Sequence, residues 1–192
     1  MNTDTSEKGL ESLIVAAMTG VPVEAPSKEP VVSHFKVAYG GGGWIAGSSD
    51  DYEREFCLDL PHLRTFLCET QPKTAEALDL DHDSPTRRKF LARLQGEISR
   101  HGTIHVLRHG VKDGPHHIDL FFGTPSEGNE KAQALHAANR FVVTRQLRYS
   151  RDETQRALDL GLFINGLPIA TFELKNSLTK QTVEDAVEQY KR

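Results

Sequence analysis

The chain has 192 residues, of which 38% are hydrophobic and 26% are charged, and its formal net charge at pH 7 is −4. This length suits one domain with a buried core. No apolar stretch approaches a membrane span, and the polar N-terminus lacks a signal-peptide core, so we expect a cytoplasmic protein. The acidic balance argues against a free-standing DNA binder, which usually presents a strongly basic surface.

Helical patterns alternate with Pro- and Gly-rich stretches in the first half of the chain. A helix is expected at 5–19, where apolar residues recur at helical spacing and predict a buried stripe: Leu10, Leu13, Ile14, Ala17 and Met18. Residues 21–60 are expected to be an irregular embellishment with a short strand at 31–38. Further helices are expected at about 61–68, 73–79 and 85–100, the last with Ser84 as N-cap and Pro85 at its first position.

Strand and helix patterns alternate in the second half. Strands are expected at 103–109 and 116–122, on either side of a Lys112–Pro115 turn. A helix at 129–138, a strand at 140–146, two apolar runs joined by Asn165-Gly166 and a final helix from about 180 follow. This order predicts the α/β class, with a mixed central β-sheet flanked by helices.

The two apolar runs carry acidic and basic side chains close to their ends. Asp159 lies on the first run, and Glu173 and Lys175 lie on the second. Because side chains alternate faces along a strand, Glu173 and Lys175 point the same way. A strict two-residue hairpin pairs Asp159 with Phe172 and leaves Asp159 on the opposite face. We therefore predict a bulge or a three-residue loop around Asn165–Leu167, which would bring all three side chains to one face.

These residue types fit a Mg²⁺ site. Mg²⁺ prefers hard oxygen ligands and usually combines one or two carboxylates with several waters. Asp159 and Glu173 are the expected carboxylates, with the Leu174 carbonyl as a third ligand. A bound Mg²⁺ would activate a water beside a phosphodiester, and Lys175 would orient that water or offset charge in the transition state. Glu-x-Lys alone is a weak signal, because about one chance match is expected in this length, and a solvated hairpin face is the alternative.

The sequence also resembles a known family in the run DLGLFINGLPIATFELKN, which is similar to the N-terminal nuclease region of the type I restriction enzyme motor subunit, HsdR. The resemblance extends through NRFVVTRQLRYS and GTIHVLRHGVK upstream and QTVEDAVEQYK downstream, and it includes the opening SEKGLE. It implies a restriction-endonuclease-like PD-(D/E)xK fold with Asp159, Glu173 and Lys175 in the motif positions, although Leu158 replaces the proline of that name.

The resemblance further implies that 1–192 is a single endonuclease domain at the N-terminus of a longer chain. ATP would act only through motor domains downstream, since the Gly-rich run at 40–43 lacks the Lys-Ser/Thr of a phosphate-binding loop. The implied partners are double-stranded DNA and the methyltransferase and specificity subunits of a restriction complex.

Further site residues are expected on the same basis. Such nucleases carry an acidic residue on an early helix, for which Glu11 is the candidate metal ligand. They also carry a Q-x-x-x-Y element after E-x-K, for which Gln189 is the candidate, with its Tyr beyond residue 192. A group of arginines leads into the Asp159 strand and would track the DNA backbone: Arg140, Arg145, Arg148, Arg151 and Arg156.

Other functions remain open. A catalytically silent docking or regulatory domain could couple the state of the DNA to the motor, and a repair or Holliday-junction nuclease would share the same residues. The spacing of His101, His105 and His109 suggests zinc on a helix, but on the expected strand each step of four spans about 13 Å, which is too far for one ion.

Overall fold

The computed structural model describes residues 7–21, 42–150, 156–175 and 187. The predicted strand at 31–38 lies outside these residues, as does nearly all of the predicted final helix from about 180. The elements, in chain order, are α1 (Glu7–Thr19), β1 (Ile45–Gly47), η1 (Ser49–Asp51), β2 (Tyr52–Glu53), β3 (Leu58–Asp59), α2 (Leu60–Thr70), α3 (Pro72–Ala77), α4 (Pro85–His101), α5 (Thr103–His109), β4 (Val111–Asp113), β5 (His116–Ile118), α6 (Glu130–Ala137), β6 (Phe141–Arg148), β7 (Ala157–Ile164) and β8 (Leu167–Phe172).

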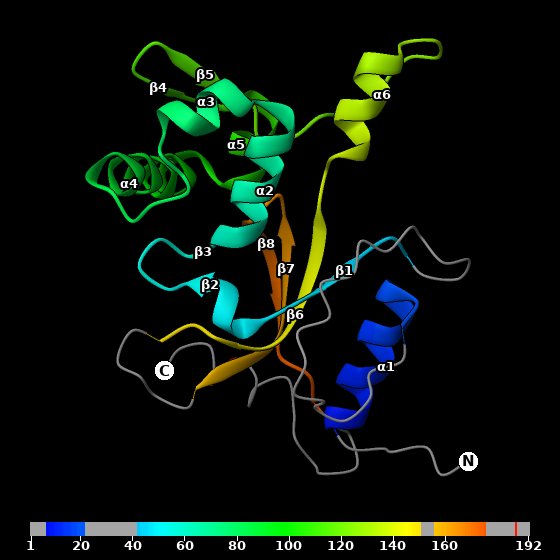
Figure 1. Ribbon diagram of the computed structural model, residues 1–192. Helices are drawn as coiled ribbons and strands as arrows, with labels where there is room; N and C mark the ends of the chain where they lie inside the picture. The colour runs from blue at the N-terminus through cyan, green and yellow to red at the C-terminus, as the bar shows by residue number, and fades with distance from the viewer. Residues whose placement is uncertain (1–6, 22–41, 151–155, 176–186, 188–192) are drawn as a thin grey trace.

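A four-stranded sheet in the order β1-β6-β7-β8 forms the centre of the molecule (Figure 1). β1 pairs with β6 in parallel, whereas β6 with β7 and β7 with β8 are antiparallel pairs. The predicted α/β class with a mixed central sheet is therefore confirmed. The short antiparallel pairs β2-β3 and β4-β5 form separate small sheets.

Three clusters of buried apolar residues pack on or beside this sheet, and one of them consists of Val142, Leu147 and Phe163 on β6 and β7. α1 covers one face, where Val15 packs against Val143 and Leu160. The larger core lies at the other end of the sheet, where α2 to α5 gather beside the β7–β8 turn, and Phe66 and Phe90 are fully buried there. Burial of apolar area in this larger core supplies most of the driving force for folding.

The longest helix follows from local signals in the sequence. Ser84 Oγ accepts a hydrogen bond from the Arg87 amide at 3.2 Å, and Pro85 occupies the first turn. Phe90 and Leu94 point into the core from its apolar side. α4 ends at Gly102, whose φ of 84° suits a residue without a side chain. The predicted cap and start of this helix are confirmed.

The predicted strand at 103–109 is wrong, because these residues form α5. Val106 and Leu107 are adjacent and both buried, and Ile104 is exposed, so the apolar residues do not alternate as a strand requires. The β-branched composition suggested a strand, but packing of a short helix after Gly102 outweighs that preference. The strand lies further on, as β4, and pairs with β5 across the predicted turn; β5 ends at Ile118, before the predicted residue 122.

The helix predicted at 5–19 is present as α1, but its buried stripe differs from the prediction. Leu10 and Leu13 are 41% and 56% exposed, and Ala17 is exposed as well, whereas Glu11 and Val15 are buried. The helix is rotated so that the Glu11 carboxylate, rather than a leucine, faces the sheet. Hydrogen bonding of that carboxylate, described below, makes the rotation stable.

The segment predicted to be irregular contains short regular elements from residue 45 onward. β1 is an edge strand of the central sheet, and η1, β2 and β3 follow it. Three residues in parallel pairing carry little periodicity, so the sequence gives no pattern for β1.

A buried amide network fixes the turn between β7 and β8. The Asn165 side chain accepts a hydrogen bond from the Arg140 amide at 2.7 Å. It donates to the carbonyl oxygen of Leu120 and to Asn139 Oδ1, both at 2.9 Å. Because every polar atom of this buried side chain has a partner, the network specifies one geometry for the turn. The turn fixed in this way also determines where the pairing of β7 with β8 begins.

Candidate active site

The β7–β8 hairpin begins with a regular two-residue turn. Ile164 pairs with Leu167 across Asn165 and Gly166, whose φ values are 52° and 83°. Positive φ at both central residues is typical of a tight hairpin turn. The prediction of an irregularity within Asn165–Leu167 is therefore wrong in its position.

A β-bulge lies a short way along β8. It shifts the pairing by one residue, as the predicted placement of Asp159 on the same face as Glu173 requires. Phe163 pairs with Pro168 and Leu162 pairs with Ala170, so Ile169 is an extra residue on β8. Pro168 has no amide hydrogen and cannot complete the ladder, which explains a bulge at this point. Beyond the bulge the register continues to Leu160 opposite Phe172.

The shifted register brings the two candidate carboxylates to the same face of the sheet. One step beyond the Leu160–Phe172 pair, Asp159 stands opposite Glu173. The Asp159 Oδ2 atom accepts a hydrogen bond from the Leu174 amide at 2.5 Å, which confirms that the two chain segments adjoin. The bulge thus has the predicted consequence for the site, although it lies nearer the middle of the strand.

Glu173 and Lys175 form a nearly buried ion pair. Lys175 Nζ lies 3.0 Å from Glu173 Oε1, and the side chains of Glu173 and Lys175 are 5% and 17% exposed. Glu173 Oε2 is buried and has no hydrogen-bond partner within the described part of the chain. An unsatisfied buried acceptor of this kind costs about 1–3 kcal/mol. A cation at this oxygen would remove that cost, so the donor set fits a hard metal ion.

Glu11 reaches the site from α1. Its side chain is only 1% exposed, and its two oxygens contact Arg145 Nε at 3.2 Å and Gln146 Nε2 at 2.6 Å. Both oxygens thus have partners from β6. The structure shows this carboxylate engaged by protein groups. Its predicted role as a metal ligand stays a prediction.

Gln146 was not anticipated from the sequence. Its Nε2 atom donates to Glu11 and also lies 3.4 Å from Asp159 Oδ1, so one amide bridges the two carboxylates. Arg145 pairs with Leu160 and Leu147 with Leu158, which leaves Gln146 opposite Asp159 with a φ of 48°. A left-handed backbone at a non-glycine residue costs about 1 kcal/mol or more. A strained residue next to two carboxylates suggests a functional constraint.

The predicted DNA-binding arginines do not form one continuous surface among the described residues. Arg145 is ion-paired with Glu11, and Arg140 lies at the other end of β6 from Arg148, with its Nε atom buried and unpartnered within the described chain. Arg148 and Arg156 are exposed. Arg151 and Gln189 lie outside the described residues.

No three His, Cys, Asp or Glu side chains in the described ranges are gathered so as to hold a metal ion. Any ion at Asp159 and Glu173 would therefore depend on backbone and water ligands as well, which is usual for Mg²⁺. Three histidine rings follow one another on the surface of α4 and α5. His101 is tilted against His105 with ring centroids 5.0 Å apart, and His105 is stacked on His109 at 4.2 Å.

The described helices include none with both the length and the apolar character needed to cross a bilayer.

A known protein family matches part of this chain. Residues 80–192, more than half of the chain, match the family model described as type I restriction enzyme R protein N terminus. This match spans β6, β7, β8 and therefore Asp159, Glu173 and Lys175. No curated protein matches the chain. No solved structure matches it either.

Proposed function

Because the chain belongs to the family of type I restriction enzyme R protein N-terminal regions, we propose that it is a Mg²⁺-dependent endonuclease domain that hydrolyses phosphodiester bonds of double-stranded DNA. Asp159, Glu173 and Lys175 would form its active site. The family supplies the context of a restriction system. The chemistry is argued from these three residues and their neighbours.

The observation that carries the proposal is the register shift at the bulge. If the same residues paired regularly from the turn, without a bulge, Asp159 would stand opposite Phe172. Because Ile169 is bulged out of the pairing, Asp159 adjoins Glu173 instead. A bulge breaks ladder hydrogen bonds, and bulges are frequent next to active sites. Here its effect is to gather two carboxylates and one lysine where a buried Glu173 oxygen lacks a partner.

Each side chain has a distinct role in the proposed reaction. Asp159 Oδ1 and Glu173 Oε2 would hold the metal, with the Leu174 carbonyl as the third protein ligand. When bound, Mg²⁺ supplies a more acidic water and positive charge beside the phosphate. Lys175, held by Glu173 Oε1, would neutralise charge that develops on the phosphate oxygens. The Leu174 amide and Gln146 would orient Asp159, and Glu11 would hold Gln146.

The remainder of a restriction complex would provide what this chain lacks. The net charge of −4 favours a nuclease that is delivered to DNA by other domains and subunits. We propose that the methyltransferase and specificity subunits read the DNA sequence. ATP would be consumed by motor domains of the parent chain. Sequence specificity would then not reside in residues 1–192.

A second candidate function rests on a specific observation. Lys175 occupies one oxygen of Glu173, and Arg145 and Gln146 occupy both oxygens of Glu11. A site that satisfies its own charges in this way also suits a docking or regulatory domain that couples the state of DNA to the motor. A nuclease of the repair or Holliday-junction type shares the chemistry, but the family match favours restriction.

Metal binding separates the two candidate functions. Calorimetric titration of the 192-residue chain with Mn²⁺ or Mg²⁺, in the presence of an uncleavable phosphorothioate duplex, is expected to show binding that Glu173→Gln abolishes. This change removes the charge of the carboxylate at nearly constant shape. Glu76→Gln, an exposed position on α3, is the matched control and should bind as the wild type does. Absence of binding in the wild type, or equal binding by Glu173→Gln, would favour the docking function.

Gln146 is expected to act as a positioning residue. Gln146→Ala and Gln146→Gly both remove the amide between Glu11 and Asp159, and each is expected to weaken metal affinity about tenfold, in the range known for groups that orient metal ligands. Gln146→Gly should be about 1 kcal/mol more stable than Gln146→Ala in urea unfolding, because glycine adopts the φ of 48° without strain. Metal affinity equal to that of the wild type in both variants would show that the amide does not position Asp159.

A further inference from the structure

Positive charge is concentrated in one segment of this acidic chain. Residues 85–112 carry seven Lys or Arg and a single acidic residue, Glu97, which gives this segment a charge of +6. Because the whole chain carries −4, the remaining residues carry −10. The positive segment forms α4, α5 and the start of β4. Composition alone does not reveal this asymmetry.

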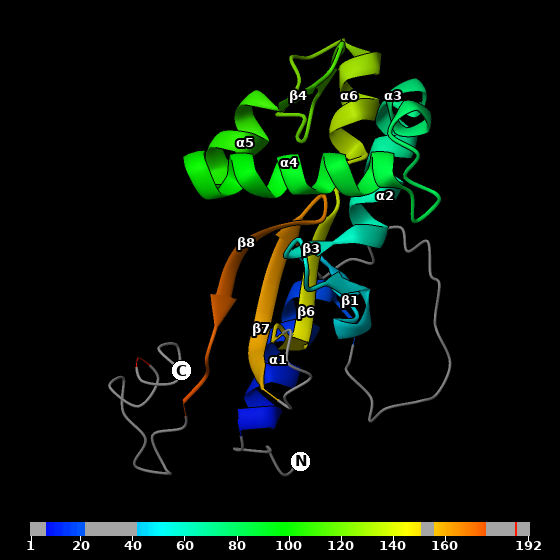
Figure 2. The same ribbon diagram turned by 90° about the vertical axis from the view of Figure 1, so that its left-hand side faces the viewer.

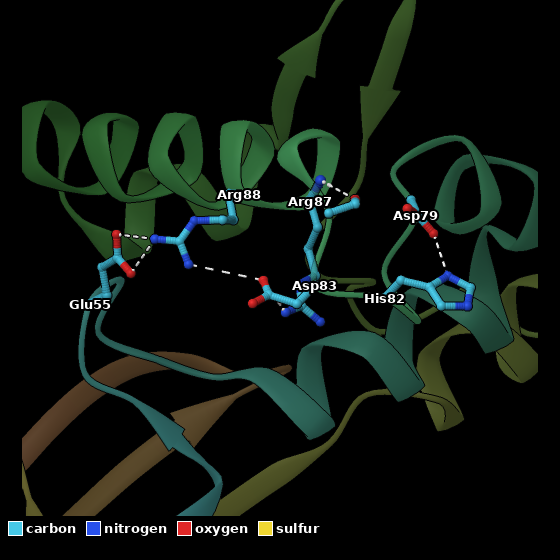
Figure 3. Close-up of polar contacts among 7 residues, drawn as sticks. Glu55, Asp79, His82, Asp83, Arg87 and Arg88 are labelled. Carbon is cyan, nitrogen blue, oxygen red and sulfur yellow. Dashed lines mark hydrogen bonds and ion pairs between the residues drawn. The ribbon is translucent and has the colours of Figure 1, made fainter.

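Three of the seven cations are engaged by neighbouring carboxylates. Arg87 Nη2 lies 2.6 Å from Asp83 Oδ1, and Arg88 Nη2 lies 2.6 Å from Glu55 Oε2. Figure 3 shows Arg88 extending from α4 toward Glu55 on one side and Asp83 on the other. Further along the helix, Arg93 Nε lies 3.3 Å from Asp113. The pairs with Glu55 and Asp113 join α4 to neighbouring segments, whereas Asp83 immediately precedes the helix that carries Arg87. These three arginines therefore have counter-charges within the chain.

The other four cations are not paired with a carboxylate in the described part of the chain. Lys89, Arg100, Arg108 and Lys112 are exposed, and none of the four has an ion-pair partner among the described residues. Gathering like charges on one surface is unfavourable by itself. A counter-charge outside the described chain would offset the repulsion.

The cations lie in a line along α4 and continue toward α5. Lys89, Arg93, Gly96 and Arg100 follow helical spacing of four, three and four residues, which places them on one side of the helix. The line is about 16 Å long at 1.5 Å per residue. A side chain added at Gly96 would meet nothing within 4 Å, so the helix backbone is open to close approach there. DNA carries one charge per 3.4 Å on each strand, so about five phosphates span this length.

Polar aromatic rings extend this surface onto α5. His101, His105 and His109 are exposed and stacked, and they offer ring nitrogens beside the cations. Desolvation is the main cause that lowers the pKa of His105, and the neighbouring His109 and His101 lower it further. A lower pKa favours the neutral ring, so the positive charge of this surface does not depend on His105.

This surface is separate from the candidate active site. α4 and α5 lie at the end of the central sheet where β7 turns into β8 (Figure 2). Asp159 is five residues along β7 from Ile164, which is about 17 Å in an extended strand. Contacts at α4 would therefore involve phosphates several base pairs away from the bond that is cut.

We propose that the α4–α5 surface, defined by Lys89, Arg100, Arg108 and Lys112, binds the phosphate backbone of double-stranded DNA. The identity of the partner rests on the proposed nuclease function, whereas the surface itself rests on charge and geometry. Neutralising several phosphates releases counterions and gives affinity without sequence preference. The α4–α5 surface is thus a basic region in a chain whose net charge is negative.

DNA binding without cleavage tests the proposal. Fluorescence anisotropy of a 30-base-pair duplex with the 192-residue chain, in EDTA, is compared between the wild type and the triple variant Lys89→Ala, Arg100→Ala, Arg108→Ala. At 50 mM salt the triple variant is expected to bind at least about tenfold more weakly. The slope of log K against log salt should fall by about 2 to 3, since each lost phosphate contact removes about 0.9.

A matched control removes the same charge elsewhere. Lys8, Lys73 and Lys131 are exposed and lie on α1, α3 and α6, so the variant Lys8→Ala, Lys73→Ala, Lys131→Ala lowers the net charge equally. It is expected to change the salt slope by less than about 1, because distant exposed charges are screened. Far-ultraviolet circular dichroism and thermal unfolding of all variants should match the wild type, since the sites are on the surface.

Several outcomes would overturn the proposal. These are undetectable DNA binding by the wild type at 50 mM salt, equal weakening by the two triple variants, and tighter binding to phosphatidylserine vesicles than to the duplex. If Glu173→Gln still cleaves DNA while the α4–α5 triple variant loses binding, the nuclease proposal fails and the α4–α5 surface stands. The reverse result would retain the nuclease and discard the surface.

Discussion

A complete restriction complex with Glu173→Gln in this domain is expected to lose DNA cleavage by about 1,000-fold or more while it keeps its ATPase activity. Charge stabilisation by a catalytic metal is worth several kcal/mol, and about 4 kcal/mol corresponds to this factor. The glutamine keeps an oxygen near Lys175 but no longer offers a charged ligand at the buried Oε2 position. Linearisation of a supercoiled plasmid and release of phosphate from ATP measure the two activities.

The same measurements on Glu76→Gln control for the loss of one carboxylate, because Glu76 is exposed on α3 and takes no part in the proposed site. This variant should cleave and hydrolyse ATP normally. Loss of both activities by Glu173→Gln would mean that the residue is structural. Normal cleavage by Glu173→Gln would exclude this carboxylate from the reaction.

Gly166→Ala is expected to destabilise the domain by about 3 kcal/mol or more in urea unfolding followed by circular dichroism. An added Cβ would lie 2.6 Å from Leu63 Cβ and 2.7 Å from the Leu63 amide nitrogen, and it would also collide with the Asp59 carbonyl oxygen. Contacts this short force the start of α2 away from the hairpin turn, and overpacking of this kind typically costs 1–3 kcal/mol. The positive φ of 83° adds its own cost.

Gly128→Ala separates the two contributions. Gly128 has nearly the same φ, 82°, but an added Cβ there meets nothing within 4 Å. This variant should lose only about 1 kcal/mol, which is the backbone cost alone. Equal losses of stability in the two variants would show that the turn does not press against α2. A Gly166→Ala chain that unfolds without denaturant, beside a stable Gly128→Ala chain, would agree with the expected order.

Features set by neighbouring residues in the sequence could be predicted well. The cap and first turn of α4 depend on Ser84 and Pro85. The Asn165-Gly166 pair is typical of the two-residue turn that is present, although the bulge or longer loop was expected at this place. The need for an extra residue in the hairpin followed from alternation of side chains and from the chemistry that Asp159 and Glu173 must share. Its location could have been inferred as well, because Pro168 cannot donate to the ladder.

Features set by distant contacts could not be predicted. The rotation of α1 depends on Glu11 meeting Arg145 and Gln146, which are far away in the sequence. The backbone of Gln146 is held in the left-handed region by this same tertiary environment, and its own sequence gives no sign of it. The strand predicted at 103–109 was wrong for a related reason. The local residue preference there favours a strand, but the packing of Val106 and Leu107 in the core stabilises the helix α5.

The bulge at Ile169 also bears on how this domain varies among related chains. A strand that lacked this one residue would keep the same cross-strand pairs, including Asp159 beside Glu173, because the bulged residue has no partner of its own. The distance in sequence between the two carboxylates can therefore differ by one between chains that place them identically in space. A search pattern with a fixed number of intervening residues would overlook such relatives, whereas one that permits a single-residue deletion in β8 would recover them.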